Sequence, residues 1–172
     1  RALADLAGPD RYLFASADLL GVFPEPRNLA VLLSRAAKGG LLRRVCRGIY
    51  LYPRAEHPRG RILFHTAALL RAAEFNYISL ETALSDAGLI SQVPMGAITL
   101  MSSGRSHTVR CGDFGRIEFV HTARRPGQVV KELAYDPECR LWRASPALAL
   151  RDMRATRRSL DLVDRGAMHD LV

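Results

Sequence analysis

The chain has 172 residues, which suffices for one domain or for two small ones. A hydrophobic fraction of 48% and a charged fraction of 24% are ordinary for a globular protein and exclude a wholly disordered chain. The net charge of +8 comes from 25 basic and 17 acidic residues.

The first part of the chain predicts short elements. Residues 3–8 read as the end of a helix that Gly8-Pro9 closes. Tyr12-Leu13-Phe14 is a short apolar run that predicts a small strand, and Ser16 is placed to cap a short helix that ends at Leu20-Gly21. Pro24-Glu25-Pro26 predicts the turn that follows.

A second helix and a hairpin come next. Asn28 is a candidate N-cap, and Gly39-Gly40 ends the helix. Two short apolar strands, 41–45 and 48–52, then flank the turn Cys46-Arg47-Gly48, and Pro53 ends the second strand. The apolar residues of the helix recur at spacings of three and four, which predicts one buried face: Leu29, Leu32, Leu33 and Ala36.

This helix and hairpin carry an unbalanced positive charge. Seven basic residues and no acid lie between Arg27 and Arg54. A helix, a turn and a hairpin in this order are the sequence outline of a winged helix-turn-helix, in which the second helix enters the DNA major groove and the hairpin follows the backbone. Arginine, lysine and asparagine supply phosphate and base-edge contacts. The predicted DNA-binding residues are Arg27, Asn28, Arg35, Lys38, Arg43, Arg44 and Arg47.

Two bland explanations stand beside this prediction. A charged helix face is commonly just solvated, and an arginine-rich composition also follows from a GC-rich genome. Along the hairpin, inward alternation of Val45, Ile49 and Leu51 would put Arg44 and Cys46 on one face and Arg43 and Arg47 on the other. One of these arginines could cover apolar core surface with its stem.

A polar segment, 54–61, reads as a linker, and the pattern changes after it. We therefore expect an α+β fold with two domains: a winged helix-turn-helix over 1–56 and a mixed α+β domain over 57–172. In the second domain the sequence predicts helices over 63–73, 80–87 (capped by Ser79), about 145–153 and 160–171, and strands over 97–102, 108–111, 116–121 and about 141–144.

The sequence offers little that indicates catalysis. Asp113-Phe114-Gly115 matches a kinase tripeptide but falls in an apparent hairpin turn without the other kinase motifs. Glu81 and Glu118 could suit a nuclease only as part of a larger carboxylate cluster. We therefore expect no enzymatic activity, no metal and no cofactor. The histidines that we considered as ligands or bases lie on separate elements: His65, His107 and His121.

Three scattered cysteines, with no CxxC, fit a reducing cytoplasm and no disulfide framework. No apolar run approaches the ~20 residues of a membrane span, and no signal peptide is visible. The first residue is Arg1 rather than Met, so we expect that leading residues are missing and that the first helix is truncated.

A second group of basic residues lies in the C-terminal half. Arg151, Arg154 and Arg158 follow at steps of three and four and could share one helix face. The group predicts either a partly acid-paired, solvated face or a second electropositive surface for nucleic acid or an acidic partner. Its members are Arg124, Arg125, Arg151, Arg154 and Arg158.

With these residues in view, the chain resembles the AbiEi-type antitoxins, the transcriptional-regulator halves of type IV abortive-infection toxin–antitoxin pairs. Four blocks in order carry the resemblance. They are Gly40-Leu41-Leu42-Arg43-Arg44-Val45-Cys46-Arg47-Gly48-Ile49-Tyr50, Tyr77-Ile78-Ser79-Leu80-Glu81-Thr82-Ala83-Leu84-Ser85, Ile117-Glu118-Phe119-Val120-His121 and Ala144-Ser145-Pro146-Ala147-Leu148-Ala149-Leu150-Arg151-Asp152.

The resemblance implies a winged helix that binds inverted repeats in its own promoter and represses the operon. It also implies a C-terminal domain that neutralises a nucleotidyltransferase-like toxin, without requiring a stable complex with it. Two alternatives stay open. One is a stand-alone winged-helix regulator whose second domain senses a ligand or mediates dimerisation, and the other is a nuclease from a mobile element.

Overall fold

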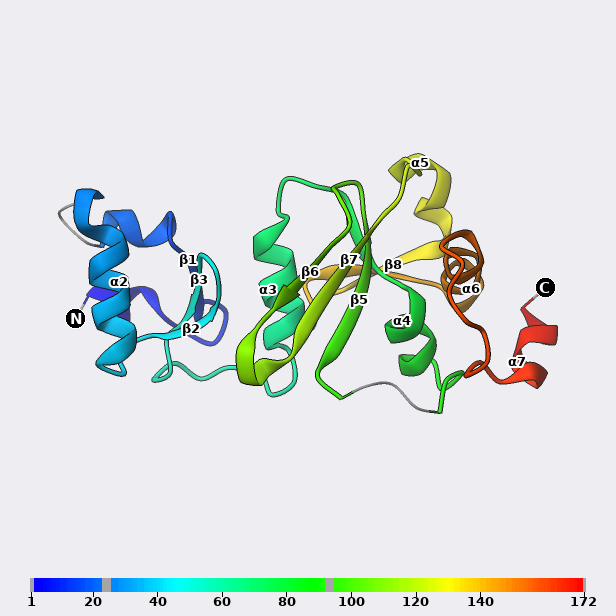
Figure 1. Ribbon diagram of the computed structural model, residues 1–172, viewed down its shortest axis with the longest axis horizontal. Coiled ribbons are helices and arrows are strands. Elements are labelled where there is room, and N and C mark those ends of the chain that lie inside the picture. The colour runs from blue at the N-terminus through cyan, green and yellow to red at the C-terminus, as the bar shows by residue number, and fades with distance from the viewer. Residues whose placement is uncertain (1, 23–25, 92–94, 172) are drawn as a thin grey trace. The chain divides into compact units, whose positions relative to one another are not determined.

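The computed structural model describes residues 2–22, 26–91 and 95–171. The chain divides into two compact units, unit 1 (Arg1–Ile62) and unit 2 (Leu63–Val172). Helices and two separate sheets give a mixed α+β fold, as the sequence predicts (Figure 1). Two residues of the predicted Pro24–Pro26 turn, 24 and 25, lie outside the described residues.

Unit 1 combines short helices with a three-stranded antiparallel sheet of order β1-β3-β2. The central strand is β3, which is the last of the three in the sequence. It pairs on one side with its hairpin partner β2 and on the other side with β1. The elements are α1 (Ala2–Leu6), β1 (Leu13–Ala15), η1 (Asp18–Gly21), η2 (Pro26–Asn28), α2 (Leu29–Lys38), β2 (Arg43–Cys46) and β3 (Ile49–Leu51).

The core of unit 1 forms where α2 meets one face of this sheet. Leu33, on the predicted apolar face of α2, is buried in the same cluster as Phe14 and Tyr50. Phe14 and Tyr50 are register partners on β1 and β3, so their rings point to the same face of the sheet. Removing these large apolar groups from water is what orders so small a sheet.

The N-cap prediction for Ser16 is wrong. The helical turn η1 begins at Asp18, with Ala17 before it and no side-chain capping bond. Ser16 instead donates twice to the carbonyl of Gly48, from its amide over 2.8 Å and from its hydroxyl over 3.3 Å. Asn28 does occupy the N-cap position of α2, but its side chain makes no capping bond there.

Unit 2 is built on a six-stranded mixed sheet of order β6-β7-β5-β4-β9-β8. Pairs β4-β5, β6-β7 and β8-β9 are antiparallel, and β5-β7 and β4-β9 are parallel. The elements are α3 (Ile62–Leu70), β4 (Asn76–Ile78), α4 (Leu80–Asp86), β5 (Ala97–Ser102), β6 (His107–Arg110), η3 (Gly112–Phe114), β7 (Arg116–His121), α5 (Pro126–Val129), η4 (Val130–Glu132), β8 (Leu133–Asp136), β9 (Leu141–Ala144), α6 (Pro146–Ala155) and α7 (Arg165–Asp170).

Helices α4 and α6 cover one face of this sheet and α3 lies on the other (Figure 1). On the α3 face, the guanidinium of Arg71 lies 4.0 Å from the ring centre of Phe119. On the α4 side, Thr82 and Thr99 bond to each other's backbone and so join the helix to β5. The alternation along the strands therefore separates an aromatic and apolar side from one that is rich in buried polar groups.

A buried carboxylate, Asp152 of α6, organises that polar side. Asp152 is fully buried and accepts hydrogen bonds from the hydroxyls of Tyr77 (3.1 Å) and Ser79 (2.7 Å). It also forms an ion pair with Arg124. Burial, followed by the negative charge of Asp152, raises the pKa of Tyr77 well above its ordinary value, so its phenol stays a donor. Ser79 does occupy the predicted N-cap position of α4, but its side chain makes no capping bond, because its hydroxyl donates to Asp152 instead.

Other elements follow the predictions in part. Strands 97–102 and 116–121 are confirmed, Asp113–Gly115 does lie in the turn region between β6 and β7, and Ser145 caps α6 by accepting from the amide of Leu148. The final helix is shorter than predicted, since α7 begins only after Asp164. Strands β4 and β8 and the short helix α5 were not anticipated, and each is only three or four residues long.

We expect Asp152→Ala to lower the free energy of unfolding by about 3–5 kcal/mol, because Arg124 and two buried hydroxyls would lose their acceptor. Urea unfolding followed by circular dichroism measures this difference. Asp170→Ala is the matched control, since Asp170 is exposed on α7, and we expect it to change stability by no more than about 0.5 kcal/mol. Equal effects of the two substitutions would contradict the proposed role of Asp152.

Candidate nucleic-acid interface

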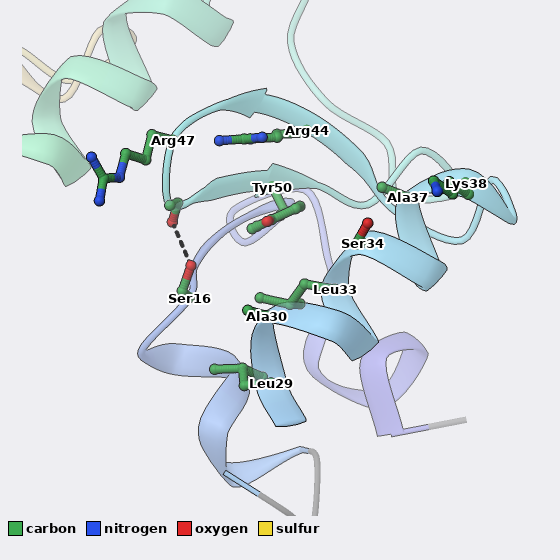
Figure 2. A pocket seen from close by; sticks show the side chains of 11 residues that line it. Ser16, Leu29, Ala30, Leu33, Ser34, Ala37, Lys38, Arg44, Arg47 and Tyr50 are labelled. Atoms are coloured by element: carbon green, nitrogen blue, oxygen red, sulfur yellow. Dashed lines mark hydrogen bonds between the residues drawn. The ribbon is translucent and has the colours of Figure 1, made fainter. Parts of the chain in front are cut away.

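A cleft with a cavity volume of about 680 Å³ opens between α2 and the β2–β3 hairpin. Small side chains of the helix, those of Ala30, Ser34 and Ala37, form one wall, and Tyr50 of β3 lies between helix and hairpin (Figure 2). Lys38, Arg44 and Arg47 also line this cleft. Of the seven predicted DNA-binding residues, these are the three that the structure brings together around one concave surface.

A bulge in the hairpin sets the direction of Arg44. Arg44 is the register partner of Tyr50, whereas Cys46 is the partner of Ile49, so the register shifts by one residue between them. Arg44 therefore lies on the cleft side with Tyr50 and Cys46 lies on the opposite face. The predicted common face for Arg44 and Cys46 is wrong, because strict alternation does not survive a bulge.

The bulge also fixes part of the Arg44 side chain. Its Nε donates to the Cys46 carbonyl over 3.3 Å. The two terminal nitrogens of the guanidinium take no part in this hydrogen bond. In Figure 2, Arg44 lies on the same side of the hairpin as Tyr50, Lys38 extends from the last turn of α2, and Arg47 extends from the hairpin turn. Three cations thus border the cleft from two elements.

No carboxylate neutralises these three cations in the part of the chain that the structure describes. Lys38, Arg44 and Arg47 are exposed and make no ion pair with any described residue. Asp18, which is close in sequence to the cleft residue Ser16, accepts a hydrogen bond from the backbone amide of Ala15. The cleft is therefore a site of net positive charge with hydroxyl groups on its walls, which suits an anion that also accepts hydrogen bonds.

The remaining predicted residues lie outside the cleft. Arg35 is exposed on α2, on the turn of the helix next to the Ser34 wall. Arg27 and Asn28 are exposed on η2, at the N-terminal end of α2. Arg43 is the register partner of Leu51 and so faces away from Arg44 across the hairpin.

Sequence patterns missed the uncharged lining of the cleft. Ser16, Ser34 and Tyr50 carry no charge and occupy separate elements, so only folding brings them together. A usable signal was present in α2, where Ala30, Ser34 and Ala37 follow at helical spacing and leave room beside the helix. Tyr50 reads as an ordinary strand residue, and indeed most of its surface is buried in the core.

The second basic group has a different character from the cleft. Arg124 pairs with Asp152, and Arg151 binds Glu132 through both terminal nitrogens. Arg158 lies after the end of α6 rather than on it, so the predicted helix face of Arg151, Arg154 and Arg158 does not form. The backbone amide of Arg125 takes part in the N-terminal capping of α5, and Arg154 is exposed.

Arg158, in the segment that follows α6, connects that segment to helix α4 and strand β7. Its Nε donates to Glu81 of α4 over 2.6 Å, and its terminal nitrogens donate to both oxygens of Glu118 on β7, over 2.8 and 3.0 Å. These bonds lower the pKa of Glu118 and raise that of Arg158. Arg124, Arg151 and Arg158 thus serve the fold, and they do not form an uncompensated second surface.

No protein-family model matches the chain, and a search of characterised proteins gave no match either. Among the described residues no group of His, Cys, Asp or Glu side chains is arranged to hold a metal ion. Within the same residues, no helix combines the length and the apolar character that a membrane crossing requires.

Glu118 gives the protein a testable acid sensitivity. Its pKa lies below the ordinary glutamate value of 4.5 because Arg158 donates to it in the folded state. A carboxyl group with a lowered pKa adds stability that is fully present above its unfolded pKa and is lost as the pH falls through the folded value. We therefore expect Glu118→Gln to flatten the loss of stability between roughly pH 5 and pH 3.

Urea unfolding at a series of pH values measures this effect. Asp170→Asn removes an exposed carboxylate from the same unit and serves as the control, with an acid limb that should match that of the unaltered protein. An unchanged acid limb in Glu118→Gln would show that the bond to Arg158 does not stabilise the folded state.

Proposed function

We propose that unit 1 binds double-stranded DNA. The observation that carries the proposal is the contrast between the two units. Arginines of unit 2 such as Arg124, Arg151 and Arg158 meet carboxylates, whereas Lys38, Arg44 and Arg47 border a cleft without one. A biased genome would enrich arginine throughout, but it would not remove acids from one surface. Phosphates are a natural counter-charge for such a surface.

A winged helix is the arrangement that we propose for this binding. The element order α1-β1-η1-η2-α2-β2-β3 and the strand order β1-β3-β2 support it, with α2 as the recognition helix and the β2–β3 hairpin as the wing. Ten residues make α2 about 15 Å long, a size that the major groove admits. Arg35 on the exposed side of α2 and Asn28 at its N-cap would then face base edges, while Arg44 and Arg47 would face phosphates.

We further propose that the protein is an antitoxin that represses its own operon in the cytoplasm and neutralises a nucleotidyltransferase-like toxin. The support is the sequence resemblance, together with where its blocks fall. Tyr77 and Ser79 of one block meet Asp152 of another, and Glu81 and Glu118 of two blocks share Arg158. These residues of the blocks therefore stabilise the interior of unit 2, and we expect a contact with a toxin to use exposed residues instead.

Neutralising the cleft tests the DNA proposal. We expect the triple variant Lys38→Gln/Arg44→Gln/Arg47→Gln to bind promoter duplex about tenfold more weakly or worse, since three exposed charge contacts of ~0.5 kcal/mol add to ~1.5 kcal/mol. The slope of log affinity against log salt should become shallower by up to about 2.7, which is ~0.9 per phosphate contact. Fluorescence anisotropy over a salt series measures both quantities.

A charge-matched control separates this cleft from net charge. Arg154→Gln/Arg157→Gln/Arg165→Gln removes three exposed cations from unit 2 and should leave the affinity and the salt slope nearly unchanged. Equal losses in the two triple variants would mean that binding reflects overall charge, and the proposed interface would be wrong.

Toxicity rescue tests the antitoxin proposal. When the gene next to this one is expressed, co-expression of the full chain from an independent promoter should restore growth. The cleft triple variant should rescue equally well, because neutralisation is proposed to reside in unit 2. Failure of the unaltered chain to rescue, combined with intact promoter binding, would instead support a stand-alone regulator.

A further inference from the structure

One edge of the unit 2 sheet is an open strand. β6 (His107–Arg110) is the terminal strand of the six-stranded order and pairs with β7 alone (Figure 1). His107, Thr108 and Arg110 are exposed. Ser106 and Cys111 flank the strand, and no proline lies in it or next to it. An edge of this kind offers a row of backbone groups to another strand.

The register identifies which backbone groups these are. The Cys111 amide donates to the Gly115 carbonyl over 2.7 Å, which makes Cys111 and Gly115 a hydrogen-bonded pair at the end of the hairpin. Such pairs alternate along antiparallel strands, so Val109 pairs with Ile117 by hydrogen bonds, whereas Thr108 and Arg110 do not bond to β7. The N–H and C=O groups of Thr108 and Arg110 therefore point to the open edge, and no described backbone group bonds to them.

This edge also carries positive charge without a matching acid. Arg110 and Arg116 are direct register partners in a pair without hydrogen bonds, the closer of the two spacings, where like charges repel. Glu118, whose charge acts on Arg116, already has both oxygens bonded by Arg158. Arg105 and His107 add to the exposed basic side chains beside the strand. Arg105, Arg110 and Arg116 make no ion pair with any described residue.

We propose that the β6 edge binds an extended acidic segment of a partner protein, which adds a seventh strand to the sheet. Backbone hydrogen bonds to Thr108 and Arg110 would supply the pairing, as in other cases of strand addition. Acidic side chains at alternate positions of the segment would lie on the same face as Arg110 and Arg116 and neutralise them. A second copy of this chain is a poor occupant, because pairing two β6 strands would bring basic residues against basic residues.

Charged side chains on an edge strand also have a protective role, since they discourage association of sheets. The two roles give opposite outcomes with an acidic strand. An edge that only protects against association does not bind an acidic strand, whereas a docking edge binds such a strand in register. The position of Arg110 opposite Arg116 favours docking, because a single charge would protect the edge without the cost of a like-charge pair.

The test uses the full-length protein and two synthetic probes. The first is an acetylated, amidated peptide of alternating valine and glutamate, six residues long, and the second replaces each glutamate with lysine. We expect the glutamate peptide to bind with a dissociation constant in the micromolar to millimolar range and the lysine peptide not to bind. Amide exchange or NMR shifts should show protection or movement at Thr108 and Arg110.

Two variants with a matched control locate the site. Thr108→Pro removes an outward N–H without breaking a bond to β7, which an edge strand tolerates, and it should abolish binding; Thr108→Ala should bind like the unaltered protein. If Thr108→Pro does not fold, Arg110→Gln/Arg116→Gln still decides the question. Each lost exposed charge contact should weaken binding by up to about fivefold.

Three outcomes would overturn the proposal. The first is no binding of the glutamate peptide at millimolar concentration. The second is binding that a folded Thr108→Pro or the double variant leaves unchanged. The third is a loss of duplex DNA affinity in the double variant without peptide binding, which would make this edge a nucleic-acid contact instead.

Discussion

Pairing between arginines and carboxylates decides which cations of this protein are available to a partner. In unit 2, Arg124 forms an ion pair with Asp152, and Arg151 forms one with Glu132. Arg158 forms ion pairs with both Glu81 and Glu118. The pair of Arg124 with the fully buried Asp152 is the clearest case, because releasing this arginine would leave a buried carboxylate unpaired. Among the described residues, two groups of exposed cations without a carboxylate lie beside a feature that a partner could use, the cleft of unit 1 and the β6 edge of unit 2.

The cleft shows how local backbone geometry can select a functional side chain. A one-residue bulge in the hairpin turns Arg44 toward α2 and leaves Cys46 on the opposite face. The bulge also brings the Cys46 carbonyl within reach of the Arg44 Nε. A side chain restrained in this way loses less conformational freedom on meeting a phosphate, which favours binding by reducing its entropic cost.

Three of the four blocks that resemble AbiEi-type antitoxins lie in unit 2, and several of their residues have structural roles there. They supply the buried partners of Asp152 and both carboxylates that bind Arg158. Residues with such roles stabilise the fold. A resemblance built on them bears on the architecture of unit 2, whereas partner choice would depend on exposed strands such as β6.

The sequence by itself determined the α+β class, the helix 29–38 with its buried Leu33, the strands 97–102 and 116–121, and the concentration of positive charge between Arg27 and Arg54. These features follow from short-range periodicity and composition, which depend only on neighbours in the chain. Only the tertiary structure decided which charges stay uncompensated. Arg158 and Glu118 are 40 residues apart, and Arg124 and Asp152 are 28 apart, so no local pattern could reveal their pairing. The same limit applies to Arg44, whose direction depends on a bulge, and to Ser79, whose hydroxyl serves a distant carboxylate instead of its own helix.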